Sequence, residues 1–343
     1  MRNNNGLPPE ILKDIEDLFG PEPVDPFRPA STGTEMLADL PPIDFEIPMP
    51  EPAPVQPAQP EPLQQERPAW LCEVTGKPVP YSHCLACSAA REQPQCPFTP
   101  AILRALNRSR EPDEGLETLK GISAATGWPV VRATSLTECQ RKAWLTRHHG
   151  RPLERPSDHW ARLRGVVFHE AMAGMAEGTM AERRVSTVVE TSQGKAVVSG
   201  RVDDYDPERK WLMDYKTTSM SLNGNAATAT GGSGLSLPLT RHIRQLHVYA
   251  WLLSRNGHPV ERITVTYMTM KDIVTVDVPM PAAPDDPRPR SQRPQTLEEI
   301  GETVMRRLEA ILAPEPPDPK PDEPWECRYC PFTDCPSWRG RAA

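Results

Sequence analysis

The sequence predicts an α/β fold for residues 132–338, because segments with helical and with strand periodicity follow one another in this part of the chain. Apolar side chains at helical spacing predict helices over 134–150, 160–177, 241–257 and 296–313. Alternating apolar and polar side chains predict strands over 183–191, 195–206, 210–218, 261–270 and 272–280. The turn sequence DPER joins the second and third of these strands, so the first three strands are expected to form an antiparallel meander.

The first 68 residues differ in composition from the rest and are expected to be disordered. They contain 16 of the 42 prolines, and residues 1–67 carry 13 acidic against 4 basic side chains, a net charge of -9. Since the whole chain has a net charge of -7, the remainder is close to neutral at +2. Any binding to nucleic acid must therefore come from local basic patches.

Within this acidic tail, apolar residues at helical spacing predict a short amphipathic helix at about residues 9–19. Such a helix either docks into a groove of a protein partner or covers its own domain, and the pattern favours neither interpretation.

The sequence shows no secretory leader pattern, and no segment approaches the roughly 20 apolar residues that cross a bilayer. We therefore expect a soluble, cytoplasmic protein without membrane contact. In a reducing compartment the eight cysteines are more naturally metal ligands than disulfide partners, and their CxxC spacing favours the same interpretation.

Residues 69–110 form a small cysteine-rich unit with a predicted helix at ILRALNR. Its four thiols belong to Cys72, Cys84, Cys87 and Cys96. Four thiolates can complete a tetrahedral zinc site, which would stabilise a segment too small for a hydrophobic core. The outer spacings fit no standard zinc finger, and His83 beside Cys84 leaves the ligand set open. A second iron-sulfur site and unligated thiols are the alternatives.

Two acidic residues and a lysine are predicted to meet on neighbouring strands. Asp214 and Lys216 are two residues apart and share one face of a strand, and pairing across the hairpin can bring Asp203 beside them. Two carboxylates and the backbone carbonyl of Tyr215 suit a hard divalent ion such as Mg²⁺ or Mn²⁺. Lys216 could then orient and polarise the attacking water. An ordinary ion pair on a solvated sheet face is the alternative.

The order of these and three further residues resembles the RecB-like branch of the PD-(D/E)XK nucleases. The shared motifs are His169 in GVVFHE, Asp203 in GRVD, Asp214 and Lys216 in DYK, and Gln245 with Tyr249 in RQLHVYAW. The resemblance covers about residues 132–338 and implies a restriction-endonuclease-like core, in which helices flank a central mixed sheet.

The same resemblance implies a role for each of these residues. His169, Asp203 and Asp214 would bind the catalytic metal. Lys216 would be the catalytic lysine, and Gln245 and Tyr249 would form a helix motif beside the site. Asp214 stands where the family more often has glutamate, which shortens the reach to the metal.

A second set of four cysteines extends the resemblance. Cys139 in SLTECQRKAW stands far upstream of Cys327, Cys330 and Cys335 in CRYCPFTDC. This order is similar to the CRISPR-associated RecB-like exonucleases and the AddB nuclease domain, and it implies a structural 4Fe-4S cluster that links the first helix of the domain to its C-terminal end. Cys335 follows after four residues where five are usual. Zinc in the same thiolates is the alternative.

The densest basic stretch follows Cys139 and supplies the expected phosphate contacts. It includes Arg141, Lys142, Arg147 and Arg151, for which a solvated helix end is the alternative interpretation. No segment resembles a base-reading helix, so little sequence specificity is expected. The uncharged stretch 219–240 is interpreted as a mobile loop that could close over a single strand.

We therefore expect a Mg²⁺- or Mn²⁺-dependent deoxyribonuclease that hydrolyses phosphodiester bonds. The resemblance implies an exonuclease acting on single-stranded DNA ends, in DNA repair and recombination or in CRISPR adaptation. The first alternative is a non-catalytic DNA-binding or scaffold protein of nuclease-like fold. The second is a zinc-dependent regulator, which no recognition helix supports.

Overall fold

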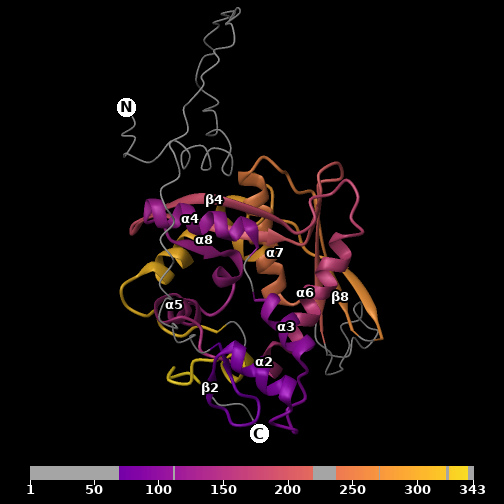
Figure 1. Ribbon diagram of the computed structural model, residues 1–343. Coiled ribbons are helices and arrows are strands. Elements are labelled where there is room, and N and C mark those ends of the chain that lie inside the picture. The colour runs from indigo at the N-terminus through magenta and orange to yellow at the C-terminus, as the bar shows by residue number, and fades with distance from the viewer. Residues whose placement is uncertain (1–68, 111–112, 219–236, 270, 322–323, 339–343) are drawn as a thin grey trace, which may run out of the picture. The chain divides into compact units, whose positions relative to one another are not determined.

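The computed structural model describes residues 69–110, 113–218, 237–269, 271–321 and 324–338 (Figure 1). The acidic tail with its predicted helix, and most of the uncharged stretch after β7, lie outside the described residues. All described residues belong to one compact unit. None of the helices in these ranges is long and apolar enough to cross a bilayer.

The first sheet is built around β5 (Gly194–Val202). β4 (Arg183–Thr191) pairs with β5 as the expected antiparallel hairpin, and β3 (Val130–Arg132) pairs with the other edge of β5 in parallel. Val197 and Val198 point to opposite faces of β5, and both are fully buried. The sheet is therefore covered on both faces.

The second sheet continues directly from the first, because only Asp203 separates β5 from β6 (Asp204–Asp206). β6 pairs antiparallel with β7 (Trp211–Thr217), and β7 runs parallel to β8 (Arg262–Met268). β9 (Ile273–Asp277) completes the sheet in antiparallel pairing with β8. The expected meander is thus divided between two sheets, since a bend at Asp203 interrupts the strand that the alternation predicted as continuous.

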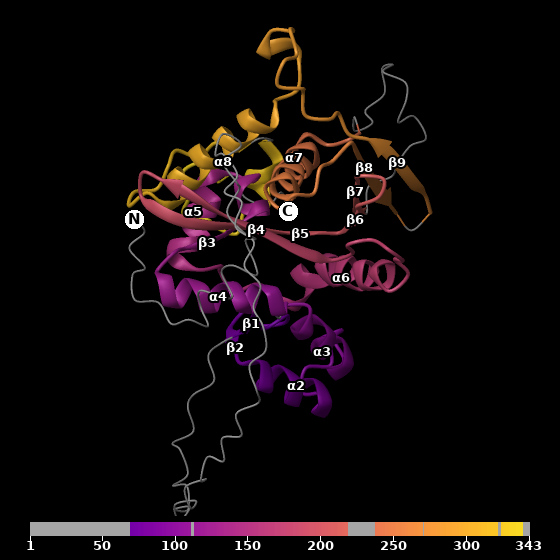
Figure 2. The same cartoon turned by 90° about the horizontal axis from the view of Figure 1, so that it is seen from above.

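Helices cover both faces of the first sheet (Figure 2). α7 (Thr240–Arg255) and α8 (Leu297–Leu312) lie on one face, where their apolar side chains pack with Val198 in the main core. α4 (Glu114–Thr126) lies on the other face and packs against Val197. The α/β class expected from the sequence is confirmed, with mixed sheets and flanking helices as in the restriction-endonuclease-like fold.

Two further helices approach the sheets from their sides. α5 (Gln140–His149) packs on α8, and α6 (Trp160–Ala173) packs on β7. Cys139 is the N-cap residue that precedes α5, and not a residue of the helix as the sequence pattern indicated. The short 3₁₀ helices are η1 (Ala133–Leu136), η2 (Pro156–His159), η3 (Arg290–Gln292) and η4 (Pro324–Arg328).

The cysteine-rich segment consists of a short hairpin and two helices. β1 (Trp70–Leu71) pairs with β2 (Pro78–Val79), and α2 (Tyr81–Ala90) and α3 (Pro100–Arg108) follow. Trp70 is fully buried and forms an apolar cluster with residues of α3 and α6. The segment therefore packs on the nuclease-like part of the chain through its own small core.

Gly200 makes room for the ring of Tyr249 where α7 crosses β5. A Cβ atom at this position would lie 2.7 Å from Tyr249 Cε1 and 3.1 Å from Leu252 Cδ1, and both of these side chains are buried. We expect Gly200→Ala to lower the free energy of unfolding by about 1–3 kcal/mol, measured by urea denaturation. Gly121→Ala in α4 is the matched control, because an added Cβ there meets no atom within 4 Å and should stabilise the helix. Wild-type stability of Gly200→Ala would contradict this packing.

Candidate active site

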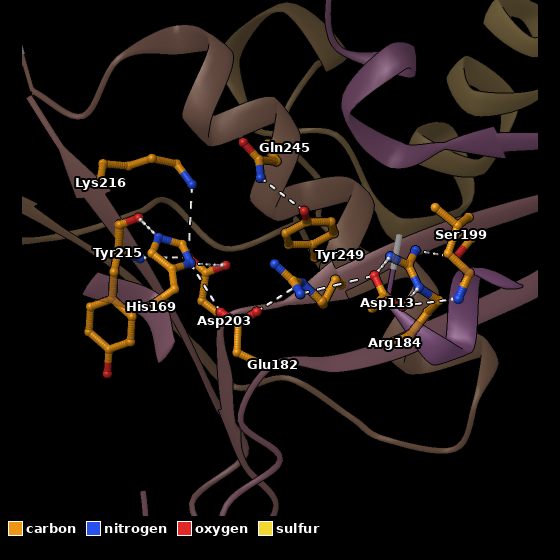
Figure 3. Close-up of polar contacts among 12 residues, drawn as sticks. Asp113, His169, Glu182, Arg184, Ser199, Asp203, Tyr215, Lys216, Gln245 and Tyr249 are labelled. Atoms are coloured by element: carbon orange, nitrogen blue, oxygen red, sulfur yellow. Dashed lines mark hydrogen bonds and ion pairs between the residues drawn. The ribbon is translucent and has the colours of Figure 1, made fainter. Parts of the chain in front are cut away.

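His169, Glu182 and Asp203 form a compact cluster of potential metal ligands (Figure 3). His169 Nδ1 lies 3.0 Å from Glu182 Oε1 and 3.4 Å from Asp203 Oδ1. The other ring nitrogen, Nε2, lies 3.0 Å from the carbonyl oxygen of Tyr215. Within the described ranges, this is the one group of three or more His, Cys, Asp or Glu side chains whose ligand atoms all lie within 4.8 Å of one another.

Four elements bring these groups together. His169 lies on α6, Glu182 precedes β4, and Asp203 occupies the bend between β5 and β6. The amide of Glu182 donates to the Asp203 carbonyl oxygen at 2.9 Å, and the amide of Tyr215 on β7 donates to Asp203 Oδ2 at 2.8 Å. The bend therefore turns the Asp203 carboxylate toward β7, where the predicted residues of DYK begin.

Lys216 lies between two carboxylates. Its Nζ atom is 2.6 Å from Asp214 Oδ2 and 3.9 Å from Asp203 Oδ2. Alternation along β7 places Asp214 and Lys216 on one face, as the sequence predicted, and the hairpin of β6 and β7 brings Asp203 beside them. The structure thus brings together all three residues that were predicted to carry the chemistry.

The buried Asp214 carboxylate lacks hydrogen-bond donors among the described residues. The residue is 1% exposed, and neither of its carboxylate oxygens makes a hydrogen bond of good geometry with a described residue. Oδ2 has only the ion pair with Lys216, and Oδ1 has no such contact. A buried carboxylate oxygen without a donor is costly, and a bound divalent cation would satisfy it. The donor set therefore fits a Mg²⁺ or Mn²⁺ ion.

Burial and charge set the protonation states. Burial alone would lower the pKa of His169, but the carboxylates of Asp203 and Glu182 outweigh it and raise this pKa to about 10. Burial raises the pKa of Asp214 to about 7, although the ammonium of Lys216 opposes the shift. Burial would lower the pKa of Lys216, but Asp214 and Asp203 raise it above its ordinary value. A divalent cation would displace the proton of His169, because a coordinating imidazole is neutral.

Glu182 was not among the residues predicted from the sequence. Its φ of 50° lies in the left-handed region that residues other than glycine rarely adopt. Its Oε2 atom is 2.8 Å from Arg201 Nε, which holds the carboxylate from the side away from His169. A signal was present, because the hairpin of β4 and β5 pairs Arg183 with Val202 and so brings Glu182 opposite Asp203.

A line of ion pairs extends from Glu182 to the start of α4 (Figure 3). Arg201 lies 4.0 Å from Asp113 Oδ2, and Arg184 Nε donates to Asp113 Oδ1 at 2.8 Å. Asp113 is also the N-cap of α4, where its side chain accepts from the Leu116 amide at 2.9 Å. These guanidinium groups lower the pKa of Asp113 to about 2, so the carboxylate stays charged. The position of Glu182 is thereby tied to a helix across the sheet.

The helix motif implied by the family resemblance lies beside the lysine. Gln245 Nε2 donates to the Tyr249 hydroxyl at 3.0 Å. Burial raises the pKa of Tyr249 to about 12, and Lys216 lies close enough to oppose this shift. The phenol is therefore neutral at physiological pH and borders the lysine without competing for its charge.

The four predicted phosphate-binding residues divide between two surfaces. Arg141 donates to the Pro317 carbonyl oxygen at 3.2 Å, and Lys142 forms an ion pair of 2.5 Å with Glu138, so both lie toward the C-terminal segment. Arg147 and Arg151 line a separate cavity of about 430 Å³.

Each predicted cysteine quartet lines one cavity. The first, of about 280 Å³, is lined by Cys139, Cys327, Cys330 and Cys335, together with His242 and Gln245 of α7. The second, of about 680 Å³, is lined by Cys72, Cys84, Cys87 and Cys96. Among these described residues, no three sulfur atoms of one quartet lie within 4.8 Å of one another.

Comparison with known proteins supports a nuclease-like domain. Residues 181–335 match the family model of the PD-(D/E)XK nuclease superfamily, a range that includes Glu182, Asp203, Asp214 and Lys216. Among solved structures, the chain is similar to the crystal structure of SSO0001, with 19% sequence identity and a TM-score of 0.45. This match covers 69% of this chain and 95% of that chain. No curated protein matches the sequence.

A metal ligand at Glu182 acts through its negative charge, which glutamine lacks although it has nearly the same shape. We expect Glu182→Gln to weaken Mn²⁺ binding by about 10- to 100-fold, measured by calorimetry, while the protein stays folded. Glu190→Gln, at the exposed end of the same strand, is the matched control and should bind Mn²⁺ as the wild type does. Glu182→Gly should relieve the left-handed backbone yet bind as weakly as Glu182→Gln. Unchanged Mn²⁺ affinity in a folded Glu182→Gln protein would exclude this role.

Proposed function

We propose that this protein is a Mg²⁺- or Mn²⁺-dependent nuclease that hydrolyses phosphodiester bonds in DNA. The observation that carries the proposal is the meeting of Asp203, Asp214 and Lys216 beside the cluster of His169 and Glu182. The match of residues 181–335 to the PD-(D/E)XK nuclease superfamily supports it independently.

The metal would be held by His169, Asp203, Asp214 and the carbonyl oxygen of Tyr215, with Glu182 as a further carboxylate. When bound, a divalent ion supplies a Lewis acid for a phosphate oxygen and lowers the pKa of a water molecule. Glu182 and Asp203 are already 3.0 and 3.4 Å from His169 Nδ1, so these three donors meet without a large rearrangement. The ion pair with Arg201 would orient the Glu182 carboxylate.

Lys216 would act as a hydrogen-bond donor and not as a base. Asp214 and Asp203 raise its pKa above the ordinary value, so its ammonium stays charged at neutral pH. A charged Nζ can orient the attacking water or stabilise the negative charge that develops on the phosphate. The proton of the water must then pass to another acceptor, since Lys216 has no free electron pair.

We extend the proposal to exonuclease action on single-stranded DNA ends, in DNA repair and recombination or in CRISPR adaptation, as the RecB-like resemblance implies. Tail residues 9–19 would then dock on a protein partner.

Two substitutions separate metal binding from water activation. We expect Asp203→Ala to weaken both Mn²⁺ binding and DNA cleavage, because Asp203 would be a ligand. Lys216→Ala should lower the cleavage rate at least about 100-fold with little change in Mn²⁺ affinity, because it removes only a donor to the reacting groups. The measurements are cleavage of labelled single-stranded and duplex DNA with Mn²⁺, beside Mn²⁺ and DNA affinity.

Lys210→Ala is the matched control for Lys216→Ala, since Lys210 lies on the same hairpin but pairs with Glu261 at the surface. It should cleave at the wild-type rate. A folded Lys216→Ala protein with wild-type cleavage would refute the role of DYK, and metal-independent cleavage would refute the mechanism. A wild-type protein that binds DNA but never cleaves it would support the non-catalytic scaffold instead.

We also propose that Cys139, Cys327, Cys330 and Cys335 hold a 4Fe-4S cluster. All four line one cavity, as a shared cluster requires. Lys142 and Arg241 also line the cavity and could balance the charge of the thiolates. Burial raises the pKa of Cys330, and Lys142 opposes the shift, as expected for a thiol that is ionised only when a metal binds.

For Cys72, Cys84, Cys87 and Cys96 we propose zinc, which would draw the four thiols together. α2 places Cys84 and Cys87 one turn apart, and Cys72 lies in the turn of the hairpin of β1 and β2. Burial and the charges of the other three thiols together raise the pKa of Cys84 to about 11, and all four cysteines line one cavity. His83 borders the same cavity and is the reserve ligand.

Metal analysis tests both cysteine sites together. We expect Cys139→Ala to lose iron and visible absorbance but keep zinc, and Cys87→Ala to lose zinc but keep iron. Cys139→Ala should also melt at a lower temperature without unfolding, because Trp144 and Arg307 still tie α5 and η1 to α8 by hydrogen bonds of 2.8 and 3.0 Å. Anaerobically purified wild-type protein with zinc and no iron would contradict the cluster.

A further inference from the structure

A cavity of about 430 Å³ lined by arginines lies apart from the metal cluster. The five arginines in its lining are Arg110, Arg132, Arg147, Arg151 and Arg162, and they come from the end of α3, from β3, from α5, from the loop after α5 and from α6. Glu154 is the one acidic side chain in the described lining. Its carboxylate is already engaged, at 2.9 Å from His159 and 3.4 Å from Arg151. The five-arginine cavity therefore has an excess of positive charge.

These arginines are open to a ligand. All five are exposed, and within the described residues Arg132, Arg147 and Arg162 have no carboxylate partner. Arg110 is held in place, because its guanidinium stacks 4.3 Å from the ring centre of Trp70 and donates to the Ala69 carbonyl oxygen at 2.9 Å. Ordinary surface arginines pair or point away from one another, whereas these converge from five segments.

The charges in the five-arginine cavity oppose one another. Packing against protein atoms lowers the pKa of Arg132 and Arg162, and the charge of Arg151 lowers both further. A guanidinium keeps its charge at neutral pH even with such a shift, so the repulsion felt by Arg132 and Arg162 persists in the free protein. A bound polyanion would relieve it.

Basic side chains also lie between the five-arginine cavity and the metal cluster. Arg132 on β3 is in register with Ser199 on β5, and Arg201 is two residues further along the same face of β5. Arg201 in turn contacts Glu182 of the cluster at 2.8 Å. Arg201, whose side chain is 39% exposed, therefore links the cavity to the cluster.

We propose that the five-arginine cavity binds phosphates of a single nucleic-acid strand whose scissile bond lies at the metal cluster. The proposal rests on the proposed nuclease function for the identity of the strand. A strand fits better than a small phosphate compound, because the five arginines come from five segments of the chain and exceed what one phosphate group can engage. Guanidinium groups suit this role, since each can bind two phosphate oxygens in a fixed geometry.

The test is DNA binding without cleavage. A labelled oligothymidylate is titrated with full-length protein at several salt concentrations, without added divalent ion, and affinity is read by fluorescence anisotropy. Each lost phosphate contact lowers the slope of log affinity against log salt by about 0.7, so Arg132→Gln/Arg162→Gln should lower it by about 1.4. Arg306→Gln, an exposed arginine of α8 that does not line the cavity, is the matched control and should leave the slope unchanged.

A second double variant, which keeps both positive charges, separates a lost phosphate contact from a folding defect. Arg132→Lys/Arg162→Lys should restore most of the slope, because the charge remains, while affinity stays below wild type, because the two-oxygen contact is lost. Wild-type affinity and slope in the Gln pair would overturn the proposal. A second outcome would also overturn it. If inorganic phosphate or thymidine monophosphate protects the wild type against heat but not the Gln pair, and the Gln pair still binds DNA normally, the cavity is a small-molecule site.

Failure of the proposed function gives a different pattern. A wild-type protein that cleaves no DNA with Mn²⁺, yet loses affinity in the Gln pair, would refute the nuclease and leave the five-arginine cavity as a nucleic-acid site. A wild-type protein that cleaves DNA, with a Gln pair that binds DNA normally, would support the nuclease and refute the five-arginine cavity as a nucleic-acid site.

Discussion

The hydrogen bond from the Tyr215 amide to the Asp203 carboxylate, at 2.8 Å, sets the geometry on which the site depends. Asp203 stands where β5 of one sheet becomes β6 of the next, so its side chain can turn toward β7 only because the strand bends there. The Glu182 amide holds the Asp203 carbonyl oxygen at 2.9 Å on the other side of the bend. A buried carboxylate is costly without partners, and the Tyr215 amide together with His169 and Lys216 supplies them.

Around this bend, each of two carboxylates is paired with a basic side chain. Asp214 and Lys216 pair at 2.6 Å beneath the cluster, and Glu182 and Arg201 pair at 2.8 Å beside it. This order keeps Lys216 charged and leaves an oxygen of Asp214 without a donor, which is a suitable arrangement for receiving a cation. β5 carries Arg201, which contacts Glu182, and it pairs with Arg132 of β3, which lines the five-arginine cavity. This β-strand therefore connects the proposed metal site with the proposed phosphate contacts.

The three cavities follow from how distant segments pack. Cys139 and the C-terminal cysteines come together because α5 packs on α8, and Trp144 donates to the Ala313 carbonyl oxygen at 2.8 Å. The five-arginine cavity forms where the cysteine-rich segment meets α6 through the buried Trp70. A metal in the cysteine-rich segment would thus also hold Arg110 in position, since Arg110 stacks on Trp70.

Local patterns in the sequence determined the element types, the sharing of one face by Asp214 and Lys216, and the hairpins of β4 with β5 and of β6 with β7, because periodicity and turn residues act over a few residues. They did not predict β3, which is too short to show alternation. They also did not predict α4, whose N-cap Asp113 contacts Arg201 and through it the site. Only the tertiary structure decided that the strand breaks at Asp203, that Glu182 joins His169, and that five arginines from separate segments share one cavity. Each of these depends on contacts between residues far apart in the chain, which burial and charge select and which local spacing does not encode.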